Sequence, residues 1–368
     1  MVSIFSLFKN KSKSKETTNS NEKDFEKSLS NEKSQKNENE NFESNPEATR
    51  QKYDALSLNE LKQLSDDGDA EAQNRLGYYY FTGLNVEKDL KTAVMYWEMA
   101  AKQGLPKAQS NLASSYMNGQ GIDKNPQKAI ELWVEAAQKN YAPAQMVIGS
   151  FFLQGLFFPQ NYEKAVDLMM KAAEHGFAQA QYNLGLCYEQ GLGVEQDETV
   201  AAEWYEKSAN QDFADAQYGL GNLILKCNNK EEHIRAVELL SKAASNNHGR
   251  SMSRLAMCYE KGTGVEQSAD LALVWYQKAA LSGDAEGQYQ LAKKYQTGQD
   301  VQQNIDKAAS LYEASAEQGH NFSQYELGKC YLTGNGLEKN EDKALFWLQQ
   351  AFSQGNEEAE NLLKLKFK

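Results

Sequence analysis

Cysteine, proline and long apolar runs are scarce in this 368-residue sequence, and each shortage removes a class of protein. Its four cysteines stand far apart with no C-x-x-C pair, a spacing that suits neither a disulfide framework nor a zinc site. Five prolines are few enough for a largely helical chain. No apolar run approaches the ~18–20 residues that a membrane-spanning helix needs. We therefore expect a helical protein in a reducing compartment, without a transmembrane helix.

Positive charge is also in short supply over most of the chain. Residues 53–368 contain 29 Lys/Arg and 42 Asp/Glu, a net charge of −13, whereas residues 1–52 contain 10 and 9. Nucleic-acid binding depends on cationic side chains that neutralise phosphates. We therefore expect no nucleic-acid partner, and we interpret the acidic character as a solvated surface rather than an acidic binding site.

A repeat of 36 residues runs through most of the sequence. Its marker is a small residue that is usually followed by a polar one, and every step is 36 residues except the 35 from Ala216 to Ser251. A fixed period in this range indicates a solenoid, which presents a surface to a partner more often than it builds an active site. The marker pairs are Ala72-Gln73, Ala108-Gln109, Ala144-Gln145, Ala180-Gln181, Ala216-Gln217, Ser251-Met252, Gly287-Gln288, Ser323-Gln324 and Ala359-Glu360.

Each repeat predicts two helices with defined ends. Ala72, Leu76 and Tyr80 fall on one face of a first helix, and Ala93 and Trp97 give the second helix its apolar face. The second helices begin at residues that are preferred N-caps, namely Asp89, Asn125, Asn161, Asp197, Ser268, Asn304 and Asn340. They end at residues that tolerate a left-handed backbone, namely Gly104, Asn140, Gly176, Asp212, Asn247, Gly283, Gly319 and Gly355.

Two repeats depart from this pattern. In the fifth, Cys227 replaces the loop glycine, Glu232 stands at the cap position and one residue is missing. In the third, the loop from Gly155 to Pro159 contains Phe157 and Phe158. These two rings predict either an exposed contact site or a locally repacked loop, and the sequence does not choose between them.

The N-terminus differs in composition from the repeats. Residues 16–52 are rich in Asn, Glu, Lys and Ser, so we expect a disordered tail. Residues 1–15 combine a short apolar segment with four lysines that come after it, the reverse of the order in a cleavable signal peptide. Three interpretations stay open: a peripheral contact with an anionic membrane, an inert tail, and a secretion or sorting signal.

The repeat resembles the Sel1-like family, relatives of the tetratricopeptide repeat, whose pattern reads A-x-x-x-L-G-x-x-Y-x-x-G-x-G-V followed by an A-x-x-W-Y-x-K-A-A helix. Good matches run from Ala180 to Val194 with Trp204 to Ala209, and from Leu255 to Val265 with Trp275 to Ala280. The resemblance implies an all-α, right-handed α/α superhelix of about eight helix pairs. We expect a capping helix in residues 53–68, repeats in 69–355 and a C-terminal capping helix in 356–368.

The resemblance also implies that the protein holds other proteins together. On the first helix, positions two, six and nine after the marker point away from the core face and line the concave side of such solenoids. We call these positions the first-helix face, and we expect a protein or peptide partner there. The alternative is that its tyrosines pack against the next repeat. The predicted partner-binding residues are Tyr78, Phe81, Met117, Met146, Leu153, Tyr182, Leu186, Tyr218, Leu225, Met257, Tyr289 and Tyr325.

The sequence offers no catalytic constellation. The four histidines stand in four different repeats, none with an acidic partner nearby in the sequence, and no nucleophile motif is present, so we expect no catalytic residue, no metal and no cofactor. Some cysteine-rich Sel1-like proteins are classed as β-lactamases, but the cysteine pair of their repeats is absent here. We expect a cytoplasmic adaptor, with a membrane-associated or host-directed bacterial factor as the alternative.

Overall fold

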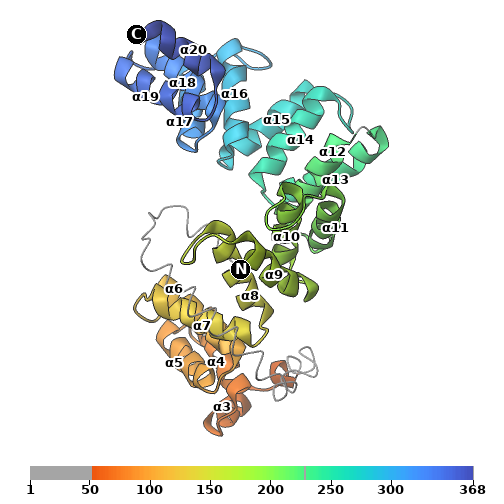
Figure 1. Cartoon of the computed structure of the whole chain (residues 1–368), viewed down its shortest axis with the longest axis vertical. Helices are drawn as coiled ribbons and strands as arrows, with labels where there is room; N and C mark the ends of the chain where they lie inside the picture. Colours follow the sequence, from red (N-terminus) through yellow and green to blue (C-terminus); the bar gives the residue numbers. More distant parts are fainter. Residues whose placement is uncertain (1–51, 228, 368) are drawn as a thin grey trace. The chain divides into compact units, whose positions relative to one another are not determined.

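The fold is described from a computed structural model of the chain, for residues 52–227 and 229–367. The regular structure in this part is helical throughout (Figure 1). The first five helices are α3 (Leu58–Asp66), α4 (Ala70–Thr82), α5 (Leu90–Lys102), α6 (Pro106–Asn118) and α7 (Pro126–Gln138). They are followed by α8 (Ala142–Gln154), α9 (Tyr162–Glu174), α10 (Ala178–Gln190), α11 (Glu198–Ala209), α12 (Ala214–Lys226) and α13 (Lys230–Ser245). The remaining helices are α14 (Gly249–Lys261), α15 (Ala269–Leu281), α16 (Ala285–Thr297), α17 (Ile305–Glu317), α18 (Asn321–Thr333), α19 (Glu341–Ser353) and α20 (Glu357–Lys366).

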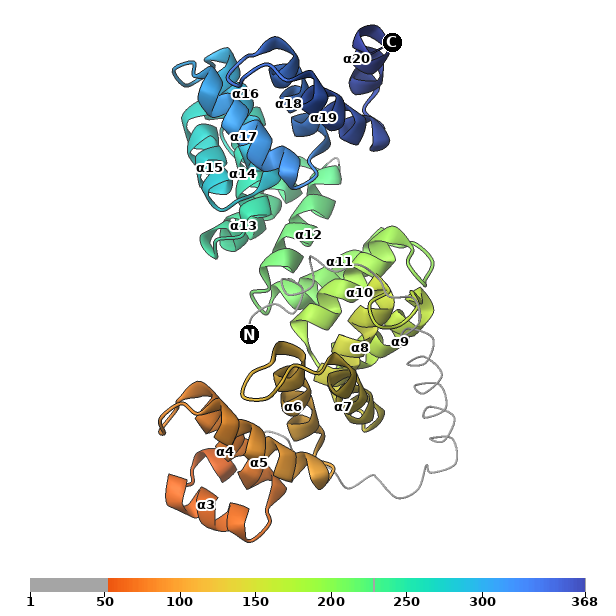
Figure 2. The same cartoon turned by 90° about the vertical axis from the view of Figure 1, so that its left-hand side faces the viewer.

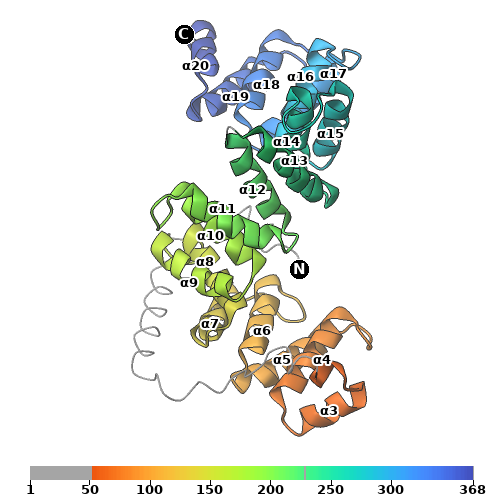
Figure 3. The ribbon, with the colours of Figure 1, turned by 90° about the vertical axis from the view of Figure 1, so that its right-hand side faces the viewer.

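The helices form tandem pairs, one for each repeat. The chain divides into two compact units, residues 1–201 and 202–368, which we describe separately. In the first unit the packed pairs are α4 with α5, α6 with α7 and α8 with α9, as Figure 3 shows. In the second unit they are α12 with α13, α14 with α15, α16 with α17 and α18 with α19, which can be followed in Figure 2. The prediction of an all-α array of helix pairs is confirmed.

The predicted helix ends are present at the level of individual atoms. Asn304 accepts a hydrogen bond from the backbone N–H of Lys307 at 2.9 Å, and its counterparts cap the second helices of other repeats in the same way. At the other end, Asn140, Asp212 and Asn247 all adopt φ values between 56° and 62°, in the left-handed region. Short polar residues replace glycine there because they adopt this backbone at lower cost than other side chains do.

Close packing in the first pair depends on a glycine of its first helix, α4. Gly77 faces Trp97 of α5, and a Cβ added at Gly77 would come within 2.5 Å of the indole ring. The indole Nε1 donates a hydrogen bond to the Asn74 carbonyl at 3.2 Å. The indole therefore has both its packing space and its polar partner on the first helix, so a larger residue at position 77 would separate the two helices.

In several repeats the glutamine of the marker joins the first helix to the helix before it. Gln145, Gln181 and Gln324 donate from their side chains to the carbonyls eight residues earlier, at 3.1–3.4 Å. Gln324 also accepts from Gln354, thirty residues later, at 2.8 Å. A buried amide must find such partners because an unpaired one costs about 1–3 kcal/mol. The marker is therefore a linker between consecutive repeats.

The loop of the third repeat, one of the two irregular repeats, is packed into the core. In the third, Phe158 is fully buried and stacks on Phe152 with ring centroids 4.7 Å apart, while Phe157 packs edge-on to Phe151 at 5.0 Å. The loop is therefore repacked rather than an exposed contact site.

In the fifth repeat, the prediction that Glu232 stands at the cap is wrong. The N-cap of α13 is Asn229, whose side chain accepts from the Glu231 N–H at 3.1 Å. Cys227 ends α12 in an extended conformation with φ −71°, instead of the left-handed turn that glycine makes elsewhere. The second helix therefore begins early and is 16 residues long, where most of the others have 13.

Candidate interaction face on the first helices

The structure leaves most of the predicted first-helix face partly accessible. Tyr78 on α4 is the most open member, with 45% of its surface exposed, and Met117 on α6 is buried. The other predicted residues are half-buried, which fits an apolar surface that touches both the core and solvent. These residues are Phe81, Met146, Leu153, Tyr182, Leu186, Tyr218, Leu225, Met257, Tyr289 and Tyr325.

Two of these tyrosines make contacts with the next repeat. The ring of Tyr218 lies 5.6 Å from His248 and 4.4 Å below the guanidinium carbon of Arg250. The ring of Tyr289 lies 4.8 Å from His320 and 6.0 Å from Phe322. His320 and Phe322 stand at the start of α18, the first helix of the next repeat. Tyr218 and Tyr289 therefore pack against the neighbouring repeat, as the alternative interpretation expected.

The two histidines beside these tyrosines, His248 and His320, each have an acidic partner that the local sequence did not reveal. The Nε2 atom of His320 lies 3.1 Å from a carboxylate oxygen of Glu286, and its Nδ1 faces the Ser323 N–H at 3.2 Å as the N-cap of α18. His248 and Asp215 repeat this arrangement at 3.3 Å. The partners are 33 and 34 residues apart in sequence, close to one repeat length, and that spacing is the signal that would have revealed them.

The contact with His320 lowers the pKa of the Glu286 carboxyl group. Burial alone would raise the pKa of Glu286, but hydrogen bonds from His320 and Gln290 outweigh it and hold the pKa below its ordinary value. The Nε2 atom of His320 faces this carboxylate, while Nδ1 accepts from the Ser323 N–H at the start of α18. Both nitrogens of His320 thus have partners, since Nδ1 also lies 2.9 Å from the Ser323 hydroxyl, and the ring joins Glu286 of one repeat to the start of α18 in the next.

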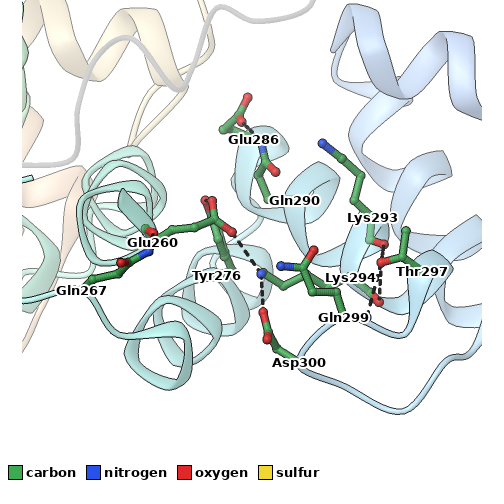
Figure 4. Close-up of polar contacts among 10 residues, drawn as sticks. All are labelled: Glu260, Gln267, Tyr276, Glu286, Gln290, Lys293, Lys294, Thr297, Gln299 and Asp300. Carbon is green, nitrogen blue, oxygen red and sulfur yellow. Dashed lines mark hydrogen bonds and ion pairs between the residues drawn. The ribbon is translucent and has the colours of Figure 1, made fainter. Parts of the chain in front are cut away.

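A second polar cluster joins repeats six and seven within the second unit (Figure 4). The side chain of Lys294 on α16 is only 5% exposed and forms ion pairs with Glu260 at 3.0 Å and Asp300 at 2.8 Å. Tyr276 of α15 donates to the other oxygen of Glu260 at 3.1 Å. Three elements, α14, α15 and the loop after α16, therefore meet around one buried ammonium group.

The chemistry of this cluster is structural. Burial works to lower the pKa of Lys294, but its hydrogen bonds to Asp300 and Glu260 prevail and raise the pKa above its usual value. Burial beside the Glu260 charge also raises the pKa of Tyr276. Both groups keep their protons at neutral pH, so neither supplies a nucleophile or a base. The cluster satisfies buried charges and fastens two repeats together.

The described part of the chain holds no cluster of metal-ligating side chains, and three of its four cysteines are buried. No three His, Cys, Asp or Glu side chains in residues 52–227 and 229–367 lie close enough together to hold a metal ion. All four cysteines are free, and Cys187, Cys258 and Cys330 are buried. Burial raises the pKa of Cys187 to about 11, which keeps the thiol protonated and unreactive. Among the described helices, none is long and apolar enough to cross a bilayer.

Sequence reasoning overlooked apolar side chains on the second helices. Leu281 on α15 is 88% exposed, and Val274 on the same helix is 42% exposed. They lie outside the buried stripe of this helix, which is Ala272, Tyr276 and Ala279, and their distance from that stripe was the available signal. Further exposed apolar residues on second helices are Met95, Met99, Ile234, Leu271, Phe346 and Phe352.

Comparison with known proteins identifies the family of the repeats. The family model described as Sel1 repeat matches residues 70–105, 106–141, 142–177, 178–213, 214–248, 249–284, 285–320 and 321–356. A protective antigen present in uropathogenic Escherichia coli strains, which displays an SLR fold, is similar at 30% identity with a TM-score of 0.61, covering 85% of this chain and 68% of that one. A Sel1 repeat protein from Oxalobacter formigenes is similar at 26% identity and a TM-score of 0.58, covering 88% and 94%. No curated protein matches.

Proposed function

The chain belongs to the Sel1 repeat family, and we propose that it is a protein–protein interaction scaffold that binds a protein or peptide on its first-helix face. The observation that carries this proposal is the row of half-buried apolar residues on successive first helices, including Met146, Leu153, Tyr182 and Leu186. A repeating row of this kind matches a segment that lies along several repeats.

The chemistry of the polar clusters supports a binding role over a catalytic one. The two polar clusters are joined by structural bonds: half-buried His320 bonds Glu286, and buried Lys294 bonds Glu260 and Asp300. Catalytic groups instead face a cleft with their reactive atoms open to a substrate. A β-lactamase-like hydrolase is therefore the weaker proposal, and absence of nitrocefin turnover would dismiss it.

Affinity capture with paired variants tests the surface. A double variant on α10, Tyr182→Ser with Leu186→Ser, should lose a partner that the wild-type chain captures from lysate of its own organism and that binds again as a purified protein. The matched control on α15, Val274→Ser with Leu281→Ser, should retain it, because those residues lie on a second helix. Retention by the α10 variant and loss by the α15 variant would move the binding surface to the second helices.

The N-terminal segment supports a second role, in which residues 1–15 address the array to an anionic membrane. These residues lie outside the described part of the chain, so the proposal rests on their sequence, in which five apolar residues precede four lysines with no acid until Glu16. The array itself is expected to be cytoplasmic. Full-length protein should co-sediment with phosphatidylserine vesicles and a chain lacking residues 1–15 should not, whereas equal binding would refute the membrane role.

A further inference from the structure

The carboxamide of Asn183 on α10 lacks a partner that its counterpart in an earlier repeat possesses. Asn183 is 2% exposed, and its Nδ2 donor is buried with no hydrogen-bond acceptor among the described residues. An unmatched buried donor of this kind costs about 1–3 kcal/mol, so its presence in a native fold requires a reason.

The repeat period shows what is missing. Asn111 stands 72 residues before Asn183, at the same position of its repeat, three residues after the marker alanine. Its Nδ2 donates to the Asn74 side-chain oxygen of the preceding repeat at 2.9 Å. The position equivalent to Asn74 in the third repeat is Met146, whose thioether is at most a weak acceptor. The third-to-fourth junction therefore keeps the donor and has lost the acceptor.

The two first helices at this junction, α8 and α10, carry almost no charge. Helix α8 contains no charged residue, and α10 contains only Glu189, in a chain of which 24% is charged. The half-buried neighbours on the first-helix face are apolar, namely Met146, Leu153, Tyr182 and Leu186. A charged ligand would lose hydration here without gaining a counter-ion, which disfavours acidic and basic segments alike.

We propose that Asn183 donates to a main-chain carbonyl of an uncharged, apolar peptide segment of a partner protein, bound in extended form across the first helices α8 and α10. Met146 stands at the position equivalent to the acceptor Asn74, and its three rotatable bonds allow it to move aside for the ligand. The inference rests on the proposed scaffold function and adds the chemical class of the partner.

Two substitutions are expected to weaken binding without weakening the fold. Asn183→Leu deletes the unmatched donor, and Met146→Asn supplies the acceptor that Asn74 provides in the first junction. Both should leave the thermal midpoint unchanged or raise it, since each removes an unsatisfied buried group. The matched control Asn111→Leu breaks an existing hydrogen bond, so it should lower the midpoint while leaving peptide binding intact.

Selection from a library of random twelve-residue peptides displayed on phage provides the readout. The full-length wild-type chain should enrich peptides without Asp, Glu, Lys or Arg in their central positions. Synthetic versions of these peptides should bind Asn183→Leu and Met146→Asn about tenfold more weakly, the effect of losing roughly 1.4 kcal/mol.

The possible results separate the two proposals. Enrichment of no peptide class would overturn the peptide-binding function itself. Enrichment of charged peptides, or equal affinity of wild type and both variants for the selected ones, would overturn the role of Asn183 and leave the scaffold function standing. A large drop in the thermal midpoint of both variants would also overturn it, because the carboxamide would then be a structural group.

Discussion

Repeats two to five and repeats six to eight begin their first helices with different chemistry on the same backbone. Leu105 starts α6 with φ −66° and ψ 114°, and His320 starts α18 with φ −67° and ψ 111°. Leu105 makes no side-chain cap hydrogen bond, and it is buried with 6% of its surface exposed. His320 accepts from the Ser323 N–H instead. The turn geometry therefore does not require a capping hydrogen bond, because burial of an apolar side chain serves as well.

The difference extends through each group of repeats. Tyr141, Phe177 and Phe213 resemble Leu105 in making no cap hydrogen bond. Asp284 caps α16 by accepting from the Gly287 N–H at 2.9 Å, as His248 does for α14. Apolar burial depends little on pH or salt, whereas hydrogen bonds to ionisable groups depend on both. The two groups of repeats should therefore respond differently to the same perturbations.

The largest expected effect comes from the apolar group. Leu105→Ala should lower stability by about 2–4 kcal/mol, the usual result of removing a buried leucine side chain. A fall in the midpoint of the helical circular-dichroism melt measures it. Leu105→Asp provides the contrast, because it adds a capping carboxylate worth about 1 kcal/mol and loses the burial. A more stable Leu105→Asp chain would show that capping outweighs burial in both groups.

Outside the fifth repeat, the sequence was sufficient for the helix pairs and their ends because those depend on local backbone chemistry. Asn140 and Asp212 adopt the left-handed geometry that their type predicted, and Asn304 caps its helix as expected. The contacts between repeats were less accessible, since they join residues about 30 to 37 apart. The pair of His320 with Glu286 and the pair of Asn111 with Asn74 follow the repeat length, but only coordinates show which side chains meet.

The candidate face was predicted only in outline. Period and helix geometry placed Tyr182 and Leu186 at partly exposed positions, but they did not show that Tyr218 and Tyr289 contact the next helix. Whether a tyrosine on this face packs or stays open depends on what stands 30 to 33 residues later, such as His320 and Phe322 for Tyr289. That choice depends on packing between repeats, which a single repeat's pattern does not contain.

An intermediate effect is expected from the polar group. His320→Ala should lower stability by about 1–2 kcal/mol, because it removes the N-cap of α18 and the donor to Glu286. His320→Asn keeps a capping oxygen and loses the contact with Glu286, so its loss should be smaller. Hydrogen exchange of the α18 amides measures both. Equal protection in wild type and His320→Ala would mean that α18 is held by its packing alone.

The smallest effect is the pH dependence of the Glu286 contact. The folded-state pKa of this carboxyl lies below its ordinary value, so its contribution is present above the unfolded pKa and is lost as the pH falls through the folded one. Glu286→Gln keeps an acceptor for His320 without the charge. The stability difference between the two chains should be about 0.5 kcal/mol or less near pH 7, since the side chain is partly exposed.

That difference should shrink to nothing as the pH is lowered from about 5 toward 3 in a series of thermal melts. Glu238→Gln, at an exposed position of α13, is the matched control and should leave the profile unchanged. The apolar group offers the internal comparison, because the cost of Leu105→Ala should stay constant over the same range. If the Glu286→Gln difference also stayed constant, the carboxylate would act through its shape rather than its charge. The contrast between apolar and ionisable helix starts would then rest on hydrogen bonding alone.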